Sequence, residues 1–333
     1  MFLAACIDPL EADLSTQQEH LVVEGIFTNE AKLNYVRLSY SQPHTSPYNK
    51  FEEKAIVTVE GSAGESFRFI YDKAGYYFAE QGEEARGTIG NSYTLYIGVG
   101  DKSYMSKPVK LLAPIPIDSI HFEVDTKTFA FKGDKEAKLY LGYNVLINYD
   151  DPAMEKNFLR WSFATTYEVW TQPWDYIDSM TGLPAPKDCC TQCFLEEKLE
   201  QFKVIDDRLT NGKQVLNQNV LFIPFEKYLG VKNKLTVYQH TITNEAYNFF
   251  RILEQQKGTT GTVFDPPPAE VKGNMFNADD GEEQVIGFFD VSGVSVRQIT
   301  INKQDIPVSF PPFSFPDDCQ KLPGATKDIP AGW

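Results

Sequence analysis

The stretch SFRFIYDKAGYYFAE (66–80) shows the fold class in its simplest form. In its first part Phe67, Phe69 and Tyr71 alternate with polar or smaller residues, the period expected of a half-buried strand. The segment from Asp72 to Gly75 is rich in turn-forming residues, and another short β-rich run follows at 75–80. The stretch therefore predicts two strands joined by a tight turn.

Similar runs recur on both sides of this stretch, each bounded by turn formers: LVVEGIF (21–27), YVRLSY (35–40), AIVTVEG (55–61) and SYTLYIGV (92–99). Many short strands at close spacing are typical of a β-sandwich. VKLLAPIPI (109–117) reads as a last strand that leaves through a stiff Pro-x-Pro connection. We therefore expect a first β-sandwich domain over 21–116 and a second domain over 117–333.

The second region is again β-rich, and one amphipathic helix stands out in TNEAYNFFRILEQQKG (243–258). Ala246, Phe249, Phe250 and Leu253 follow the spacing of one helix face. Thr243 is placed to cap the first turn, and Gly258 follows Lys257 as a stop signal. The sequence thus predicts a mainly β chain in which the second domain carries a helix at 243–257.

Composition and charge exclude several classes of function. The chain is 42% hydrophobic and 14% aromatic, which is enough apolar material for packed cores. Its formal net charge of −15 would repel a phosphate backbone, so we expect no nucleic-acid binding. The four histidines, His20, His44, His121 and His240, are isolated in sequence.

Motifs for catalysis and cofactors are absent from the sequence. It contains no G-x-S-x-G elbow, no H-E-x-x-H pair and no P-loop, so we expect no enzyme activity and no cofactor. Asn277, Asp279, Asp280 and Gly281 resemble a calcium loop only faintly, because the EF-hand spacing and the distal glutamate are missing. A hydrolase that uses a pair of the 46 acidic residues stays open as an alternative, although nothing in the sequence selects the pair.

Four of the five cysteines form a group of their own. Three occur in KDCCTQCF, as Cys189, Cys190 and Cys193, and Cys319 lies near the C-terminus. Free thiols are one alternative and a four-thiolate zinc site is another, but zinc ribbons use two separate knuckles. We expect two disulfides, one of which ties the tail to the 189–193 loop. Bonding between the adjacent Cys189 and Cys190 is not expected, because it strains the peptide between them.

The fifth cysteine indicates a lipid anchor. Leu3-Ala4-Ala5-Cys6 matches a bacterial lipobox, in which small side chains admit the backbone to the signal peptidase and the cysteine is acylated. Residues 1–5 would then be the remnant of a signal peptide, and the polar, acidic stretch 6–20 a flexible tether. Since only Met1 and Phe2 precede the motif, we expect a start codon further upstream or a trimmed sequence. No later segment has the roughly 20 apolar residues that span a bilayer.

Several blocks of the chain resemble the Bacteroidota lipoproteins of the domain-of-unknown-function family 4249. They are LVVEGIFTNE (21–30), NSYTLYIGVGDKSYMSKPVKLLAPIPIDSI (91–120), NFLRWSFATTYEVW (157–170) and TNEAYNFFRILEQQKGTTGTVFDPPPAEVKGNMFN (243–277). The position of Cys319 shortly before the terminal Trp333 also resembles the pattern of this family.

The resemblance implies a lipid-anchored protein on the cell-surface side of the outer membrane, with an immunoglobulin-like N-terminal domain. It also implies a TonB-dependent receptor, or another outer-membrane β-barrel, as a partner that the protein assists or for which it captures a ligand. A structural subunit of an outer-membrane assembly or export complex is the main alternative. The family supplies no catalytic residues.

The best candidate for a recognition surface is VWTQPWDYIDSMTGLPAPKDCC (169–190). Trp170, Trp174 and Tyr176 lie among prolines and glycine just before the cysteines, and aromatic side chains in a tied loop are suited to burial against a partner. The alternative is that the two tryptophans fill the core of the second domain. For FPPFSFP (310–316) the sequence also leaves two alternatives, an exposed contact surface or a tail that packs on the sheet.

Overall fold

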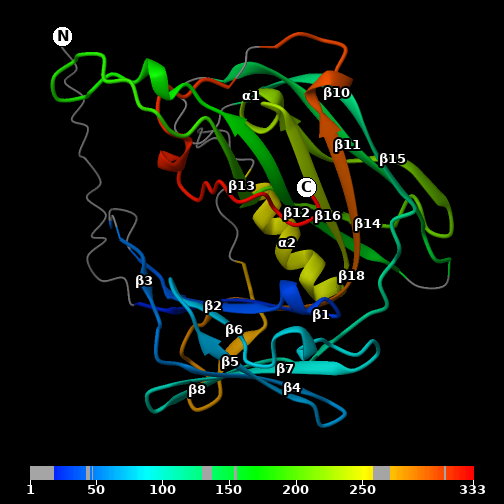
Figure 1. Cartoon of the computed structure of the whole chain (residues 1–333). Coiled ribbons are helices and arrows are strands. Elements are labelled where there is room, and N and C mark those ends of the chain that lie inside the picture. Colours follow the sequence, from blue (N-terminus) through cyan, green and yellow to red (C-terminus); the bar gives the residue numbers. More distant parts are fainter. Residues whose placement is uncertain are drawn as a thin grey trace, which may run out of the picture. The chain divides into compact units, whose positions relative to one another are not determined.

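The computed structural model describes residues 19–42, 46, 48–129, 137–153, 156–257, 271–310 and 313–333 (Figure 1). The protein is mainly β, as predicted. It divides into two compact units, one built from residues 1–110 and 270–291 and the other from 111–269 and 292–333. Cys6 and most of the expected tether lie outside the described residues.

The first unit consists of antiparallel strands with two short 3-10 turns. In order of hydrogen-bonded neighbours the main path runs β1-β2-β6-β5-β4-β7-β8-β17, with β3 on β2 and β9 on β7. The bounds are β1 (Leu21–Thr28), η1 (Ala31–Leu33), β2 (Tyr35–Tyr40), β3 (Lys50–Phe51), β4 (Ile56–Gly61), β5 (Ser66–Tyr71), β6 (Tyr76–Ala79), η2 (Gly82–Glu84), β7 (Ser92–Val99), β8 (Lys102–Ser106), β9 (Val109–Lys110) and β17 (Met275–Asn277).

The core of the first unit brings together strands that are not neighbours along this path. The Phe27 ring on β1 lies 5.2 Å from that of Phe67 on β5 and 4.8 Å from that of Tyr93 on β7. Phe69 is buried in the same core, whereas Tyr71 at the end of β5 is 37% exposed. Two layers of strands with apolar side chains between them are consistent with the expected β-sandwich. The immunoglobulin-like topology stays a prediction.

The division into units differs from the boundary expected between residues 116 and 117. Ile115 and Ile117 both lie in the core of the second unit, and the Ile115 amide donates to Oγ1 of Thr241 at 2.9 Å. The Pro-rich connection is therefore part of the second unit. Conversely, β17 pairs with β8, with Met275 opposite Ser106, so residues 270–291 belong to the first unit.

The second unit contains two antiparallel sheets. One has the order β10-β11-β15, and the other runs β13-β12-β16-β18 with β14 also on β12. The bounds are β10 (Ser119–Phe129), β11 (Lys138–Asp150), β12 (Phe158–Trp170), η3 (Pro173–Asp175), β13 (Gln192–Lys198), β14 (Lys203–Asp206), β15 (Gln214–Pro224), α1 (Phe225–Tyr228), β16 (Lys232–Thr241), α2 (Asn244–Lys257), β18 (Ile286–Asn302, of which residues from 292 belong here), η4 (Lys303–Asp305) and η5 (Cys319–Lys321).

Trp161 on β12 is fully buried in the core of the second unit. Its ring lies 6.3 Å from that of Tyr149 on β11, so the two sheets meet through their aromatic side chains. Trp161 Nε1 donates to Oε1 of Gln239 at 2.9 Å, and Gln239 Nε2 donates to the carbonyl of Ile115 at 2.8 Å. The polar atoms of a fully buried tryptophan and glutamine are thus satisfied inside the core.

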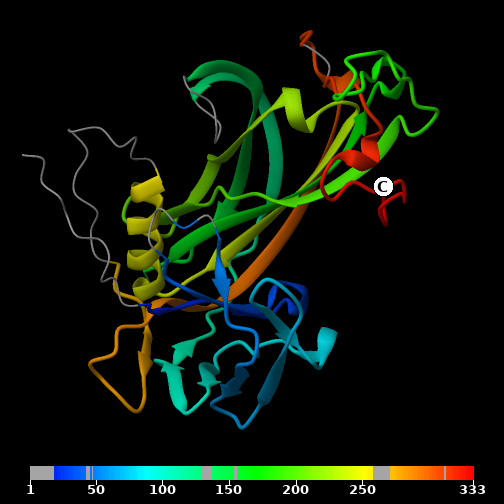
Figure 2. The same cartoon turned by 90° about the vertical axis from the view of Figure 1, so that its left-hand side faces the viewer.

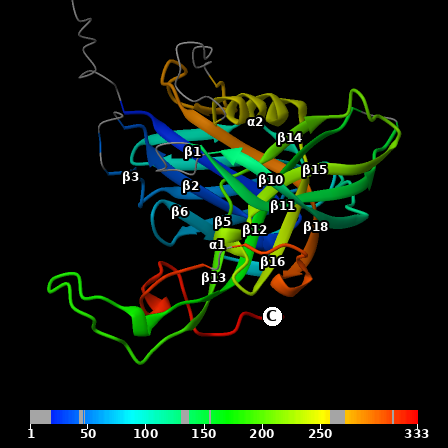
Figure 3. The ribbon, with the colours of Figure 1, turned by 90° about the horizontal axis from the view of Figure 1, so that it is seen from above.

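Helix α2 confirms the predicted amphipathic helix. The Ala246 amide donates to Oγ1 of Thr243 at 3.2 Å, which is the capping contact expected from the sequence. Ala246 is fully buried, and Phe250 lies under the Arg160 guanidinium at 4.5 Å, so the apolar face covers β12 and β14 (Figure 3). The expected stop at Gly258 lies outside the described residues. Within the described part of the chain, no helix has the length and apolar character needed to cross a membrane.

Replacing Trp161 with alanine should lower the free energy of unfolding by about 3–5 kcal/mol, because a large cavity opens and Oε1 of Gln239 loses the indole donor. The matched control is Trp174→Ala, which removes the same side chain from a site that is 57% exposed. We expect the control to change stability by less than about 0.5 kcal/mol. Chemical denaturation of both variants measures the difference, and equal losses would contradict the assignment of Trp161 to the core.

Candidate recognition loop and cysteine cluster

The segment between β12 and β13 forms an ordered excursion, which we call the aromatic loop (residues 170–187). Its two arms are held by backbone hydrogen bonds, from the Ala185 amide to the Tyr176 carbonyl at 2.9 Å and from the Lys187 amide to the Pro173 carbonyl at 3.0 Å. At the tip, Asp178 Oδ1 accepts from the amides of Met180 and Thr181, and Gly182 adopts a positive φ of 68° that suits the turn. The backbone polar groups are therefore largely paired within the loop.

The side chains of this loop are unusually apolar for a surface. Five large hydrophobic side chains are more than half exposed: Trp170 (55%), Trp174 (57%), Ile177 (59%), Met180 (94%) and Leu183 (64%). The alternative that Trp170 and Trp174 fill the core is therefore wrong. An exposed cluster of this kind marks an interaction site more often than an inert surface.

Tyr176, the third aromatic candidate, packs inside the loop instead of being fully exposed. It is half-buried, and the Lys187 ammonium lies 3.6 Å from the centre of its ring. Lys187 also forms an ion pair with Asp317 of the C-terminal segment. Partial burial raises the pKa of Asp317, but the hydrogen bonds from Lys187 and from the Asp318 amide outweigh it, so the pKa lies below its usual range. The loop and the tail, which run side by side in Figure 2, are thus also joined by an ion pair.

Trp170 borders a small hollow of about 210 Å³ at the base of the loop, which is lined by Trp170, Gln172, Gly230, Val231 and Phe313. Its indole Nε1 donates to the buried Glu168 carboxylate at 2.6 Å, and Gln192 donates to the same oxygen at 2.7 Å. These contacts fix the orientation of the Trp170 ring.

The described part of FPPFSFP (310–316) packs against the protein. The Phe310 ring stacks on that of Phe225 in the core, with centroids 4.5 Å apart. The Gln172 amide donates to the Phe315 carbonyl at 2.9 Å, and the Phe315 amide donates to Oε1 of Gln172 at 3.0 Å. The segment is therefore a packed tail that supports the aromatic loop, although Pro311 and Pro312 lie outside the described residues.

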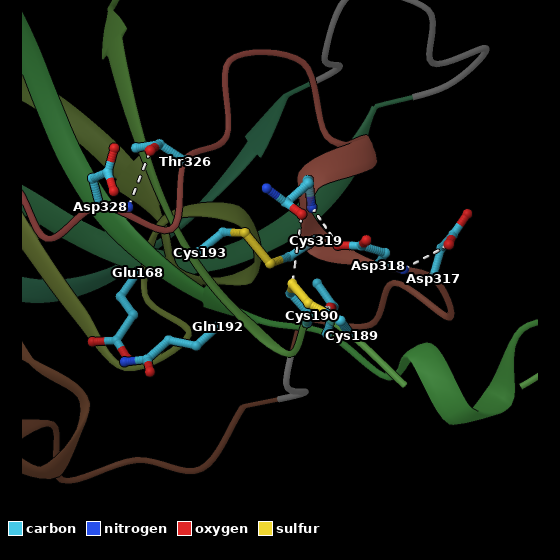
Figure 4. The surroundings of a disulfide bond; sticks show 12 residues. Glu168, Cys189, Cys190, Gln192, Cys193, Asp317, Asp318, Cys319, Thr326 and Asp328 are labelled. Atoms are coloured by element: carbon cyan, nitrogen blue, oxygen red, sulfur yellow. Dashed lines mark hydrogen bonds between the residues drawn. A yellow bond between two sulfur atoms is a disulfide. The ribbon is translucent and has the colours of Figure 1, made fainter. Parts of the chain in front are cut away.

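The cysteines pair as Cys193–Cys319 and Cys189–Cys190 (Figure 4). The first disulfide links residues 126 positions apart and ties the tail to the strand after the loop, as expected. Both of its cysteines are fully buried in the core of the second unit. The expectation that adjacent cysteines would not bond to each other is wrong. Because Cys193 points into the core and meets Cys319 there, Cys189 and Cys190 are left as each other's partners.

Backbone hydrogen bonds also join the C-terminal tail to β13. Phe194 and Thr326 exchange two hydrogen bonds of 2.8 and 3.0 Å, and the terminal Trp333 ring meets Phe194 edge-on at 5.2 Å. Figure 3 shows the loop and the tail side by side, as Figure 2 does from another direction. The loop base, β13 and the tail therefore form one connected substructure.

Among the described residues, the two metal motifs considered and disfavoured on the sequence alone have other contacts. A four-thiolate zinc site would need Cys193 and Cys319, which are joined to each other; Cys189, Cys190 and Asp318 do gather within 4.8 Å. In the faint calcium motif, Asn277 Oδ1 accepts the amides of Asp279 and Asp280. A separate lysine, Lys102, pairs with Glu283 there at 2.9 Å and supplies the positive charge that a calcium ion would bring.

One serine–histidine contact superficially resembles a hydrolytic pair. Ser162 Oγ lies 2.9 Å from Nε2 of His240, while Nδ1 of His240 lies 3.4 Å from the Arg160 guanidinium. Arginine can only donate, so Nδ1 must accept and Nε2 must carry the proton. Burial, followed by the Arg160 charge, lowers the pKa of His240 well below its usual value. His240 is therefore not arranged to take a proton from Ser162.

The fold and the loop define a mainly β protein of two units whose second unit displays a disulfide-tied apolar loop. The chain belongs to the family described as "Domain of unknown function (DUF4249)", whose model matches residues 7–298. A search of curated proteins found no match.

Mass spectrometry of the denatured, unreduced protein should find no alkylated thiol at Cys189, Cys190, Cys193 or Cys319. Digestion should yield a cross-linked peptide pair containing Cys193 and Cys319, and this peptide should separate on reduction. A cross-link from Cys319 to Cys189 or Cys190 would contradict the pairing described above.

The free energy of unfolding should fall as the pH drops below about 6.5, because His240 stays neutral in the folded chain and takes up a proton in the unfolded one. About one pH unit below that value its contribution approaches about 1.4 kcal/mol per pH unit, and it ends once the pH reaches the lowered folded pKa. Denaturation at pH 6.5 and 5.5 should show a smaller loss for His240→Gln than for the natural chain. Equal losses would refute a neutral, buried His240.

Proposed function

We propose that this protein is a non-enzymatic, lipid-anchored cell-surface module of the outer membrane that docks on a TonB-dependent receptor or a similar outer-membrane β-barrel. The observation that carries the proposal is the aromatic loop, with Trp174, Ile177, Met180 and Leu183 exposed on a frame held by hydrogen bonds, the Lys187–Asp317 ion pair and a disulfide. A frame ordered before binding loses little conformational entropy when it is buried.

The shape of the surface favours a protein partner over a small ligand. The hollow beside Trp170, at about 210 Å³, is smaller than the roughly 300–1,000 Å³ of usual ligand pockets. The loop tip instead presents a tryptophan and aliphatic side chains of the kind that fill pockets on a partner. If the tip docks on the barrel, the hollow at the base of the loop stays next to the interface. A ligand bound there could contact both this protein and its partner.

The anchor is the second part of the proposal. Lipid on Cys6, followed by the tether over 6–20, would hold the two units near the membrane and raise the local concentration of the protein around a barrel. Its support is the Leu3-Ala4-Ala5-Cys6 motif of the sequence.

Docking is tested by a detergent pull-down of the tagged, lipidated protein from its native membrane, followed by identification of the integral β-barrel that co-purifies. Trp174→Ala combined with Met180→Ala should reduce recovery of that barrel at least about tenfold, since central apolar contacts dominate interfaces. The matched control is Leu209→Ala with Leu216→Ala, two exposed leucines of the same unit outside the loop. The control should bind normally, and both variants should melt at the natural temperature.

A loss of binding that the control shares, or that accompanies a lower melting temperature, would contradict docking through the loop. Tyr176 is left unchanged in this experiment because its contact with Lys187 makes it part of the loop's frame.

Anchoring is tested independently by mass spectrometry of the mature protein. Acyl chains should be found on Cys6, and Cys6→Ala in the complete precursor should release the protein from the membrane fraction. A mature N-terminus upstream of Cys6 would refute the anchor while leaving docking by the loop open to its own test.

A further inference from the structure

The two disulfides differ sharply in their access to solvent. Cys193 and Cys319 are fully buried, whereas Cys189 is exposed and its neighbour Cys190 lies just beneath the surface. Reduction of a disulfide requires a thiolate or phosphine to reach one of its sulfurs, so access controls which bond opens first. The Cys189–Cys190 bond is therefore the one that an external reductant meets.

A carboxylate stands beside this exposed pair. The ligand atoms of Cys189, Cys190 and Asp318 all lie within 4.8 Å of one another (Figure 4). The Cys319 amide donates to the Cys190 carbonyl at 3.0 Å, which holds the segment of Asp318 against the cysteine pair. One Asp318 oxygen, Oδ1, accepts from the Gln320 amide at 2.9 Å, which orients the carboxylate.

We propose that Cys189–Cys190 is a reversible redox pair whose reduced form, together with Asp318, binds one thiophilic divalent metal ion such as Zn²⁺. Reduction by a low-molecular-weight dithiol breaks the sulfur–sulfur bond, and two electrons and two protons pass to the cysteines while the dithiol becomes a disulfide. The metal ion then displaces the two thiol protons and is held by two thiolates and one carboxylate.

The dimensions of the cluster suit such an ion. Around tetrahedral zinc, with bonds of about 2.3 Å to sulfur and 2.0 Å to oxygen, the ligand atoms lie about 3–4 Å apart. The ligand atoms of the observed cluster, all within 4.8 Å of one another, lie close to this range. Three protein ligands leave one coordination position for water.

The buried disulfide keeps this site in place after the exposed one opens. Asp318 precedes Cys319, which stays bonded to Cys193, so the carboxylate does not drift away when Cys189 and Cys190 become thiols. The two disulfides thus have different roles. Cys193–Cys319 holds the scaffold in place, and Cys189–Cys190 alternates between a disulfide and a pair of thiolate ligands. The inference stands apart from the docking proposal, because it uses none of the loop's exposed side chains.

The test uses the full chain and a water-soluble phosphine added in steps, with alkylation and mass spectrometry to identify the thiols that appear. Cys189 and Cys190 should react while Cys193 and Cys319 stay blocked. The partly reduced protein should then bind one Zn²⁺ per chain in a chelator competition, and Co²⁺ should give the visible absorption of a tetrahedral thiolate site. The oxidised protein should show neither.

Asp318→Asn should weaken zinc binding by the partly reduced protein at least about tenfold, because a charged ligand is lost while the amide oxygen can still accept from Gln320. The matched control, Asp328→Asn, alters another carboxylate of the tail and should bind zinc normally. Cys189→Ser, at the exposed position, should abolish binding of one zinc per chain, and melting curves should show all three variants folded.

Three results would each overturn the proposal. They are simultaneous reduction of all four cysteines, zinc binding by the oxidised protein, and an unchanged zinc affinity in Asp318→Asn.

Discussion

The Cys193–Cys319 disulfide is the contact on which the organisation of the candidate site depends. It joins the beginning of β13 to a tail more than a hundred residues away, inside the core of the second unit. Beside it Phe194 and Thr326 pair, the Trp333 ring meets Phe194 edge-on, and Phe315 bonds with Gln172 at the loop base. A cross-link that closes so long a loop removes much conformational freedom from the unfolded chain. The tail can therefore pack stably against the base of the aromatic loop, although it has little regular secondary structure.

The aromatic loop combines two properties that usually exclude each other. Its side chains at Trp174, Ile177 and Met180 are exposed and apolar, which costs free energy in water. Its backbone is nonetheless ordered, because its amides and carbonyls bond to one another and Lys187 bridges Tyr176 and Asp317. A surface that is ordered and apolar before any partner arrives is suited to binding, and this is the physical basis of the proposed docking.

Polar groups buried in the second unit act as structural links. Gln239 joins Trp161 to the connection at Ile115, and His240 is held neutral between Ser162, Ser292 and Arg160. A serine beside a histidine can suggest hydrolysis, yet the proton positions required by Arg160 give the imidazole the opposite role. The arrangement explains the burial of this histidine without any catalytic step.

The sequence by itself determined the features that depend on near neighbours. Alternation at 66–71 and similar runs predicted the strands, and the period and cap at 243–257 predicted α2, because strand and helix patterns are local. Tertiary structure alone decided the rest. The pairing of Cys193 with Cys319, the return of β17 to β8 and the burial of Trp161 while Trp170 stays exposed all depend on residues distant in sequence. Trp161 and Trp170 lie on the same strand, and only the position of the opposing sheet decides which of them enters the core.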